Sequence, residues 1–162
     1  MKRTVKVLKH SKHADIVINE NGDLYDLIAC EDCKVVPGVP ALVSLGISMQ
    51  LPSGCIAKIY DRSSTPKKFL MGLSNSVGII DNSYCSDMDI WRYQATSLKL
   101  GKKEFSQIKE GDRICQFEIC LSPKATVWQK LKWLFTSGYE FKYVEHLDNP
   151  RRGGFGEGTG NN

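Results

Sequence analysis

An aspartate and a tyrosine at the end of an apolar run are well placed to do chemistry. Val77, Ile79 and Ile80 lead into Asp81, and Tyr84 follows after an Asn-Ser pair, which is typical of a strand entering a hairpin. A carboxylate at such an edge can hold and polarise a water molecule for attack on phosphorus, which is general-base catalysis. An Asx-turn aspartate that bonds its own backbone has the same surroundings, so the local sequence leaves both roles open.

Tyr84 also has two interpretations. It can be an ordinary hairpin aromatic, since aromatic residues are common in strands and at their ends. Against a nucleotide, a ring lying under the sugar would leave no room for a 2′-hydroxyl. The same side chain would then select deoxyribose over ribose.

Residues 61–65, with the sequence DRSST, have the composition of a phosphate-binding turn. The Arg62 guanidinium supplies charge and bidentate geometry, and the hydroxyls of Ser63 and Ser64 are donors that fit non-bridging oxygens. A surface turn can have the same composition, so this segment alone does not decide. Gln116, on the polar face of a predicted strand, can face the same site.

The end of the chain, residues 149–162, has five glycines among fourteen residues and one large apolar side chain, Phe155. We expect this tail to be flexible until a ligand orders it, and residues 1–148 to form the folded domain. Arg152 offers charge for a terminal phosphate, and Phe155 offers a stacking face for a base. Plain disorder is the alternative explanation of so many glycines.

Short strands must position these residues. From residue 43 to residue 51, apolar side chains occupy every odd position, which predicts one half-buried strand. Cys115, Phe117, Ile119 and Leu121 form a second run of this kind. Turn signals separate many such short runs, so the sequence predicts an all-β jelly-roll sandwich.

One segment has helical periodicity and predicts a short amphipathic helix near residues 124–136. Its apolar face consists of Val127, Trp128, Leu131, Leu134 and Phe135. Because a helix this short needs tertiary packing, we expect a lid packed on the domain or a contact between subunits. Binding to a membrane or to another protein is the alternative.

The composition fits one soluble cytoplasmic domain. The chain has 162 residues, a net charge of +4 and a pI near 8.7, without a basic tail. A phosphorylated small molecule satisfies this charge, and we expect neither a nucleic acid nor a membrane as partner. The N-terminus lacks the apolar core of a signal peptide, which favours the cytosol.

Cysteines in the cytosol are expected to be reduced, so we predict that all six are thiols. Cys30 and Cys33 have CxxC spacing, and His10 and His13 could complete a four-ligand zinc site. A single CxxC without a second clean pair is weak support for zinc. Thiols on strands or turns are the favoured interpretation.

Five segments in a fixed order resemble the conserved blocks of trimeric dUTPases, particularly the phage-type branch. They are GDLYDLIACED, DRSST, NSVGIIDNSY, GDRICQ and RGGFG, and the similarity runs from about Gly22 to Thr159. The resemblance implies hydrolysis of dUTP to dUMP and pyrophosphate, with Mg²⁺ chelated by the triphosphate. It also implies homotrimers with active sites between subunits, each tail capping a site built largely by its neighbours.

The resemblance assigns roles to individual residues. Asp81 would activate the water that attacks the α-phosphorus, and Asp26 would reach the metal through water. Other positions would bind substrate: Asn75, Ile79, Ile80 and Tyr84 around uracil and deoxyribose, Arg62, Ser63, Ser64 and Gln116 on phosphates, and Arg152, Phe155 and Thr159 from the tail.

The chain departs from the family pattern in places. Asp61 stands where proline is usual, so the backbone of the phosphate turn is expected to be less constrained. Ser86 replaces a common glycine, and the fifth block, GFGEGTG, adds one residue and brings in Glu157. Residues 124–143 are more helical and richer in tryptophan than the usual link to that block.

Two alternatives remain. A jelly-roll dCTP deaminase shares the fold and the RSS turn, although the IIDNSY segment and the glycine-rich tail favour dUTPase. From another class, the chain could be a regulatory module that uses this scaffold to bind a protein. The amphipathic segment and the altered tail are the features that support it.

Overall fold

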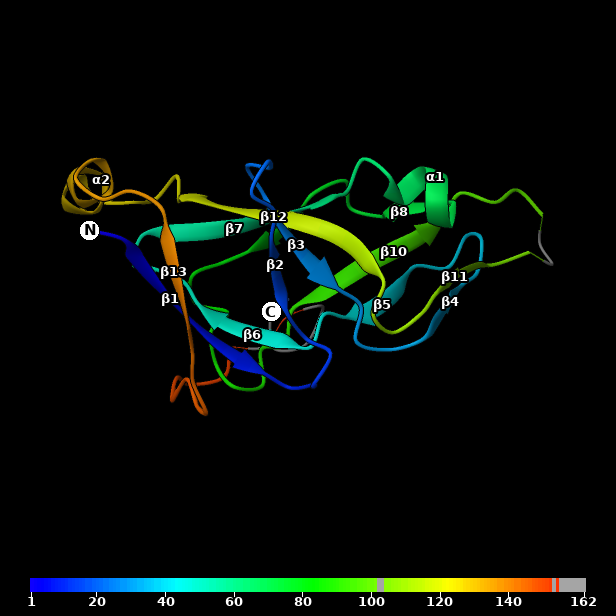
Figure 1. Cartoon of the computed structure of the whole chain (residues 1–162), viewed down its shortest axis with the longest axis horizontal. Helices are drawn as coiled ribbons and strands as arrows, with labels where there is room; N and C mark the ends of the chain where they lie inside the picture. The colour runs from blue at the N-terminus through cyan, green and yellow to red at the C-terminus, as the bar shows by residue number, and fades with distance from the viewer. Residues whose placement is uncertain (102–103, 153, 155–162) are drawn as a thin grey trace, which may run out of the picture.

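Strands dominate the computed structural model, which describes residues 1–101, 104–152 and 154. This confirms the predicted all-β class, with two short helices added. The strands are β1 (Arg3–Lys9), β2 (Ile16–Ile18), β3 (Tyr25–Ile28), β4 (Cys33–Val35), β5 (Ala41–Ser44), β6 (Ile47–Gln50), β7 (Cys55–Asp61), β8 (Met71–Leu73), β9 (Gly78–Ile80), β10 (Arg92–Ser97), β11 (Ser106–Ile108), β12 (Arg113–Leu121) and β13 (Tyr139–Tyr143). The helices are α1 (Thr65–Phe69) and α2 (Val127–Leu134), and they lie toward opposite ends of the molecule (Figure 1).

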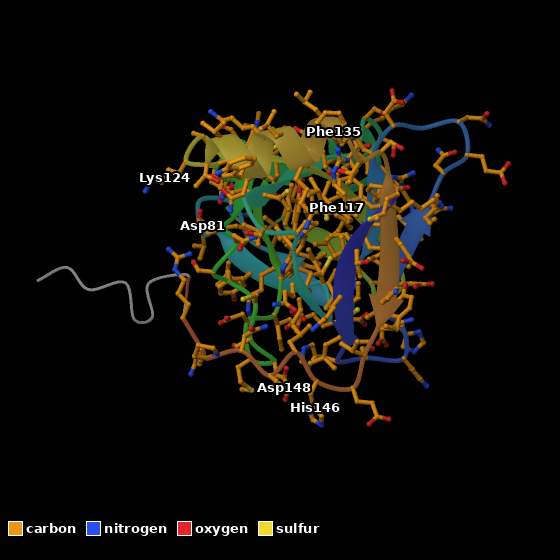
Figure 2. All side chains as sticks on the ribbon, turned by 90° about the vertical axis from the view of Figure 1, so that its left-hand side faces the viewer. Asp81, Phe117, Lys124, Phe135, His146 and Asp148 are labelled. Carbon is orange, nitrogen blue, oxygen red and sulfur yellow. The ribbon has the colours of Figure 1, made fainter. Side chains whose placement is uncertain are left out.

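The largest sheet has the strand order β2-β3-β12-β7-β9. Its long middle strand, β12, pairs antiparallel with β3 on one side and with β7 on the other. Smaller sheets have the orders β13-β1-β6, β5-β10-β8 and β11-β4. Phe117 of β12 lies in the middle of the molecule (Figure 2), with its ring centroid 5.4 Å from those of Tyr25 and Trp91.

The prediction of one strand over residues 43–51 is wrong in one respect. All five odd positions are buried as expected, but the segment forms two strands, β5 and β6, that belong to different sheets. Gly46 lies between them with a φ of +63°, a backbone conformation that other residues rarely adopt. A side chain at Gly46 would also meet the Cys30 sulfur at 2.5 Å, so this corner of the fold depends on glycine.

The second predicted strand is confirmed. Cys115, Phe117 and Ile119 of β12 point into the core, whereas Gln116 and Glu118 remain half-buried on the other face. The pairing of β12 with β3 shifts register between Arg113 and Cys115, as at a β-bulge. Gln116 therefore stands opposite Asp26 of β3 and Tyr60 of β7.

Helix α1 is a five-residue turn of helix that the periodicity of the sequence did not predict. Pro66 lies in its first turn, where the fixed φ of proline suits a helix start. Thr65 and Phe69 are its buried residues, and Leu70 ends it with a left-handed φ of 50°. Two buried residues are too few to produce a helical periodicity in the sequence. The Thr65-Pro66 pair is the one local signal of a helix start.

Helix α2 is shorter than the predicted segment because its N-terminal cap lies at Thr126. The Thr126 hydroxyl accepts a hydrogen bond from the Gln129 backbone N–H at 3.3 Å, and Gln129 Oε1 accepts one from the Thr126 N–H at 2.8 Å. This capping box satisfies two backbone donors that would otherwise lack partners. The residues before it form a turn, in which the Ala125 N–H bonds the Ser122 carbonyl.

The apolar face of α2 points to solvent. Trp128 is 80% exposed and Phe135 82% exposed, and Figure 2 shows α2 along the edge of the molecule. The helix instead contacts the domain through Gln129, which donates to the Ser53 hydroxyl, and through Trp133, whose ring lies under the Arg3 guanidinium. The prediction of an apolar lid on its own domain is therefore wrong. Contact between subunits, and the alternative of binding to a membrane or another protein, stay predictions.

The segment from Ile79 to Asp89 does not form the expected hairpin. β9 pairs with β7, whereas the next strand, β10, pairs with β5 and β8 in another sheet. The connection is a loop whose first turn is closed by the Tyr84 N–H on the Asp81 carbonyl, at 3.0 Å. This loop carries the candidate catalytic residue from one sheet to the other.

All six cysteines are free thiols, as predicted. Burial raises the pKa of Cys30 and of Cys33, so neither is a reactive thiolate. Among the described residues no group of three or more histidine, cysteine, aspartate or glutamate side chains could hold a metal, which gives the zinc alternative no support. Nor do these residues include a helix that is long and apolar enough to span a membrane.

Candidate active site

The structure brings several predicted phosphate and metal residues together at the end of β7. Asp26 Oδ2 lies 3.0 Å from Arg62 Nε and 3.7 Å from Arg113 Nη1. The Asp26 carboxylate is buried, with 8% of its side chain exposed, so the two guanidinium groups compensate its charge. Gln116 lies beside them and donates to the Asp61 carbonyl at 3.0 Å. We call Asp26, Arg62, Arg113 and Gln116 the Arg62 cluster.

The phosphate turn itself, residues 62–64, is closed by a hydrogen bond from the Thr65 N–H to the Arg62 carbonyl at 2.9 Å. Ser63 and Ser64 are exposed on it, and the Ser64 side chain makes no capping hydrogen bond to α1. Their hydroxyls can therefore meet a ligand. Thr65 is buried and donates to the Ile114 carbonyl at 2.7 Å, which fixes the far side of the turn.

Asp61 corrects an expectation about this turn. Although it replaces a proline, the turn is not left unconstrained, because the Asp61 carboxylate accepts hydrogen bonds from the Leu73 N–H and the Tyr93 hydroxyl. Burial and this contact raise the pKa of Tyr93 far above its ordinary value, so the hydroxyl stays a donor. Side-chain bonds thus replace the constraint that a proline ring would have supplied.

A second cluster surrounds Asp81 at the edge of the molecule (Figure 2). Arg152 Nη1 lies 2.6 Å from Asp81 Oδ2, and both side chains are partly exposed. Tyr84 is 9% exposed, and its hydroxyl donates to the Ile90 carbonyl at 3.1 Å. A Cβ atom on Gly154 would lie 2.8 Å from Cε2 of Tyr84, so the backbone there passes close to the edge of the ring. Asp81, Tyr84, Arg152 and Gly154 form the Asp81 cluster.

Asn82 fixes the backbone next to Asp81. Its side-chain amide donates to the Pro52 carbonyl at 2.9 Å and to the Cys55 carbonyl at 3.1 Å. Two well-formed bonds hold the loop on the turn that precedes β7. Asparagine is therefore a structural anchor beside the candidate catalytic carboxylate, a role that the sequence analysis missed.

The segment after β13 runs along the same loop and delivers Arg152 to it. Asp87 accepts hydrogen bonds from the Leu147 N–H at 2.6 Å and from the His146 ring at 2.9 Å, and Asn149 donates to the Cys85 carbonyl. The Leu147 bond and His146 lower the pKa of Asp87, and the bond to Asp87 raises the pKa of His146. These tethers were also not predicted, since they join residues about sixty positions apart.

The two clusters lie at opposite ends of β7. Ile80, the neighbour of Asp81, pairs with Ala57 near the start of the strand, whereas Arg62 follows its last residue. The five steps from residue 57 to residue 62 correspond to roughly 16 Å of extended chain. Hydrogen bonds of about 3 Å cannot join both clusters to one phosphate group. A single copy of the chain therefore holds two separate parts of the predicted site.

The other predicted residues are divided as well. Asn75 is exposed in the connection between β8 and β9, at the end of β9 away from Asp81. Ile79 is 54% exposed, whereas Ile80 is buried in the core beside the Asp81 cluster. Phe155 and Thr159 lie outside the described residues.

Comparisons with known proteins identify the family to which the sequence belongs. The sequence model of the family described as dUTPase matches residues 16–132. The chain belongs to the dUTPase family. It is therefore an enzyme that hydrolyses dUTP, and the resemblance to the dUTPase family is confirmed.

Relatives of this family member include a phage-derived enzyme. This chain is 39% identical over 137 residues to an SPbeta prophage-derived deoxyuridine 5′-triphosphate nucleotidohydrolase of Bacillus subtilis. The alignment covers 85% of this chain and 84% of the relative. The corresponding enzyme of Lactococcus lactis is 31% identical over 118 residues, covering 70% and 79%. The prophage origin of the first relative agrees with the phage-type branch that the motifs suggest.

Solved structures show the same fold. The dUTPase of Streptococcus mutans superposes with a TM-score of 0.64 at 22% identity, covering 74% of this chain and 95% of that one. The dUTPase of phage phi11 of S. aureus superposes with a TM-score of 0.62 at 18% identity, covering 76% and 93%. The predicted dUTPase-like fold is confirmed.

Proposed function

We propose that dUTP is hydrolysed at a site assembled from the Asp81 cluster of one copy and the Arg62 cluster of another, within a homotrimer. The observation that carries this proposal is the separation of the two clusters along β7. A carboxylate that activates water must lie within hydrogen-bond reach of the reacting phosphate. Symmetric association of copies supplies the missing half to every site at once.

Asp81 is the general base of the proposed reaction. Its carboxylate is partly exposed and pairs with Arg152, so a ligand can reach it. A water held by Asp81 gives its proton to the carboxylate as its oxygen bonds the α-phosphorus, and the bond to the bridging oxygen of the pyrophosphate breaks. Arg152 must leave Asp81 in this process, and the negative charge of the triphosphate draws it away.

The phosphates are bound by the Arg62 cluster and the turn beside it. Arg62 offers its guanidinium, Ser63 and Ser64 their exposed hydroxyls, and Gln116 its amide, which now bonds the Asp61 carbonyl. These donors hold the pyrophosphate part of the substrate. The leaving group then departs without a proton from the protein, because its charge is already stabilised.

The donors present fit Mg²⁺ bound mainly by the triphosphate. Asp26, whose carboxylate also contacts Arg62 and Arg113, would hold the metal through a water molecule. Mg²⁺ keeps several waters and takes few protein ligands in such sites. When bound, it neutralises phosphate charge and orients the chain of phosphates. A solved phage phi11 variant structure coordinates a structural Mg(II) ion, which also supports magnesium.

The nucleoside is placed by the Asp81 cluster. Tyr84 is fixed by core packing and by its hydrogen bond to Ile90, so its ring is a rigid wall for deoxyribose. Backbone groups at Ile79 and Ile80 contact the base, and the Asn75 amide, which lies toward the Arg62 end of β9, reaches it from the copy that supplies the Arg62 cluster. Phe155 and Thr159 close over the ligand from the tail.

Other features fit an oligomer in the cytosol. The solvent-facing side of α2, with Trp128 and Phe135, is available for contact between subunits. Six free cysteines suit a reducing compartment.

Pyrophosphate release tests the proposed function. We expect the chain to release pyrophosphate from dUTP, with kcat/KM at least about a hundredfold lower for UTP, dTTP and dCTP. Ammonia release from dCTP would instead favour the deaminase alternative. Absence of both products, with dUTP still bound, would favour the regulatory module.

Tyr84→Ala should narrow the difference in kcat/KM between dUTP and UTP by about tenfold or more, because the wall against the 2′-hydroxyl is removed. The change opens a core cavity, so thermal stability should fall as well. Tyr84→Phe is the matched control, since it loses the bond to Ile90 and keeps the ring. If discrimination survives in the alanine variant, another part of the pocket excludes ribose.

A further inference from the structure

The Asp61 side chain accepts hydrogen bonds from two strands outside its own sheet. Its Oδ1 lies 2.5 Å from the Tyr93 hydroxyl of β10 and 3.1 Å from the Leu73 N–H of β8, and its Oδ2 lies 3.3 Å from the same N–H. β8 and β10 pair with each other, with Leu73 opposite Ala95. The carboxylate therefore ties the end of β7 to the β5-β10-β8 sheet.

The space for this carboxylate depends on Gly72. A Cβ atom at Gly72 would lie 2.9 Å from Asp61 Oδ2, closer than such contacts normally are. Tyr93, the donor on the other side, is fully buried, so it cannot follow a displaced carboxylate. Gly72 on β8 leaves room for the Asp61 carboxylate, and Tyr93 on β10 donates a hydrogen bond to it.

We propose that Asp61 is a positioning residue that fixes the phosphate turn and thereby sets the affinity for the triphosphate. This role rests on the proposed function, in which Arg62, Ser63 and Ser64 bind phosphates. Asp61 immediately precedes Arg62, and its carbonyl accepts the hydrogen bond from Gln116. With Thr65 anchored on Ile114 at the other side, the turn is held at both ends. A turn ordered before binding loses less conformational entropy when the ligand arrives.

The charge of Asp61 acts in the opposite direction to its tether. A carboxylate one residue from a phosphate-binding arginine repels a triphosphate, so removal of charge alone would tighten binding. Loss of the tether would weaken binding. Asp61→Asn removes the charge and keeps an oxygen that can accept from the Leu73 N–H. Asp61→Ala removes the charge and the acceptor. Comparing the two variants separates the effect of the charge from that of the tether.

Asp15 offers a matched control. Its carboxylate also accepts hydrogen bonds from a backbone N–H, that of Ile16, and from a tyrosine hydroxyl, that of Tyr143. It belongs to neither cluster. Asp15→Ala and Tyr143→Phe therefore remove the same kinds of bonds as Asp61→Ala and Tyr93→Phe without touching the phosphate turn.

Calorimetric binding of α,β-imido-dUTP and of dUMP to the full chain tests the role, alongside kcat, KM and melting temperature. We expect Asp61→Ala to weaken binding of the triphosphate analogue about tenfold and that of dUMP less than about threefold. The dUTP KM should rise more than kcat falls. Asp61→Asn should restore binding to within about threefold, and Tyr93→Phe should weaken it about threefold. The Asp15 and Tyr143 controls should lower melting temperature only.

Three results would overturn the positioning role. One is an Asp61→Ala variant that lowers melting temperature like Asp15→Ala and leaves analogue affinity unchanged. Another is tighter binding by Asp61→Ala, which loses both the tether and the charge, because repulsion would then be the main effect of the residue. The third result applies if Asp61→Ala does not fold: it is unchanged affinity for the analogue in both Asp61→Asn and Tyr93→Phe. A wild-type chain that binds neither ligand would instead contradict the proposed function itself.

Discussion

Replacing Asp81 by asparagine should lower kcat for dUTP by on the order of 10² or more while the enzyme still binds its substrate. The amide has nearly the shape of the carboxylate, but it cannot accept the proton of the attacking water. The loop that carries residue 81 is fixed by Asn82 on the turn before β7, so the substitution should not displace it. Chemistry and binding can therefore be separated at this position.

Steady-state kinetics and calorimetry with α,β-imido-dUTP measure the two quantities. The dissociation constant of the analogue should change by less than about threefold. Asp15→Asn, at another partly exposed aspartate paired with a basic residue, should leave both quantities unchanged. Equal losses of analogue binding and of turnover in Asp81→Asn would show that Asp81 holds the structure and does not act as the base.

Much of the β architecture follows from alternation and turn signals. The alternating burial of residues 43–51 and 115–121 was predicted because a side chain in a strand points to one face or the other. The break at Gly46 was not predicted, because the alternation of buried and exposed side chains continues unchanged where the chain passes from one sheet to the other. Burial is a local pattern, whereas the partner of each strand is decided by the whole chain.

The candidate site shows the same division. The types and order of Arg62, Asp81 and Gln116 predicted a phosphate-directed site. Their separation into two clusters was invisible in sequence, because it depends on the register of β9 on β7. The phosphate turn was wrongly predicted to be less constrained, because the partners that hold Asp61, Leu73 and Tyr93, lie 12 and 32 residues away in sequence. Side-chain bonds across sheets leave no periodic signal.

Helix α2 was recognised by its apolar face, but the sequence did not decide whether that face packs on the domain or contacts another subunit. Periodicity shows that Trp128 and Phe135 lie on one side of the helix, not what that side contacts. In this chain, Gln129 and Trp133 bind the domain and the apolar side faces outward. An apolar helix face that is exposed in one copy is consistent with an assembly of several copies.

The most direct test of the account uses mixed trimers of two inactive variants. Asp81→Asn lacks the base and Arg62→Ala lacks the phosphate-binding guanidinium, so each homotrimer should be nearly inactive. Coexpression with two different tags, followed by purification on both, isolates trimers that contain both variants. Around a threefold axis, any such trimer has one site in which both contributing clusters are intact.

Mixed trimers should therefore regain about one third of the wild-type kcat, since one of three sites is complete. Matched trimers of wild-type chains carrying the two tags set the reference, and Asp81→Asn chains carrying both tags set the background. Activity no higher than this background, in trimers shown by mass to contain both variants, would contradict the account. It would mean that Asp81 and Arg62 of one chain serve the same site.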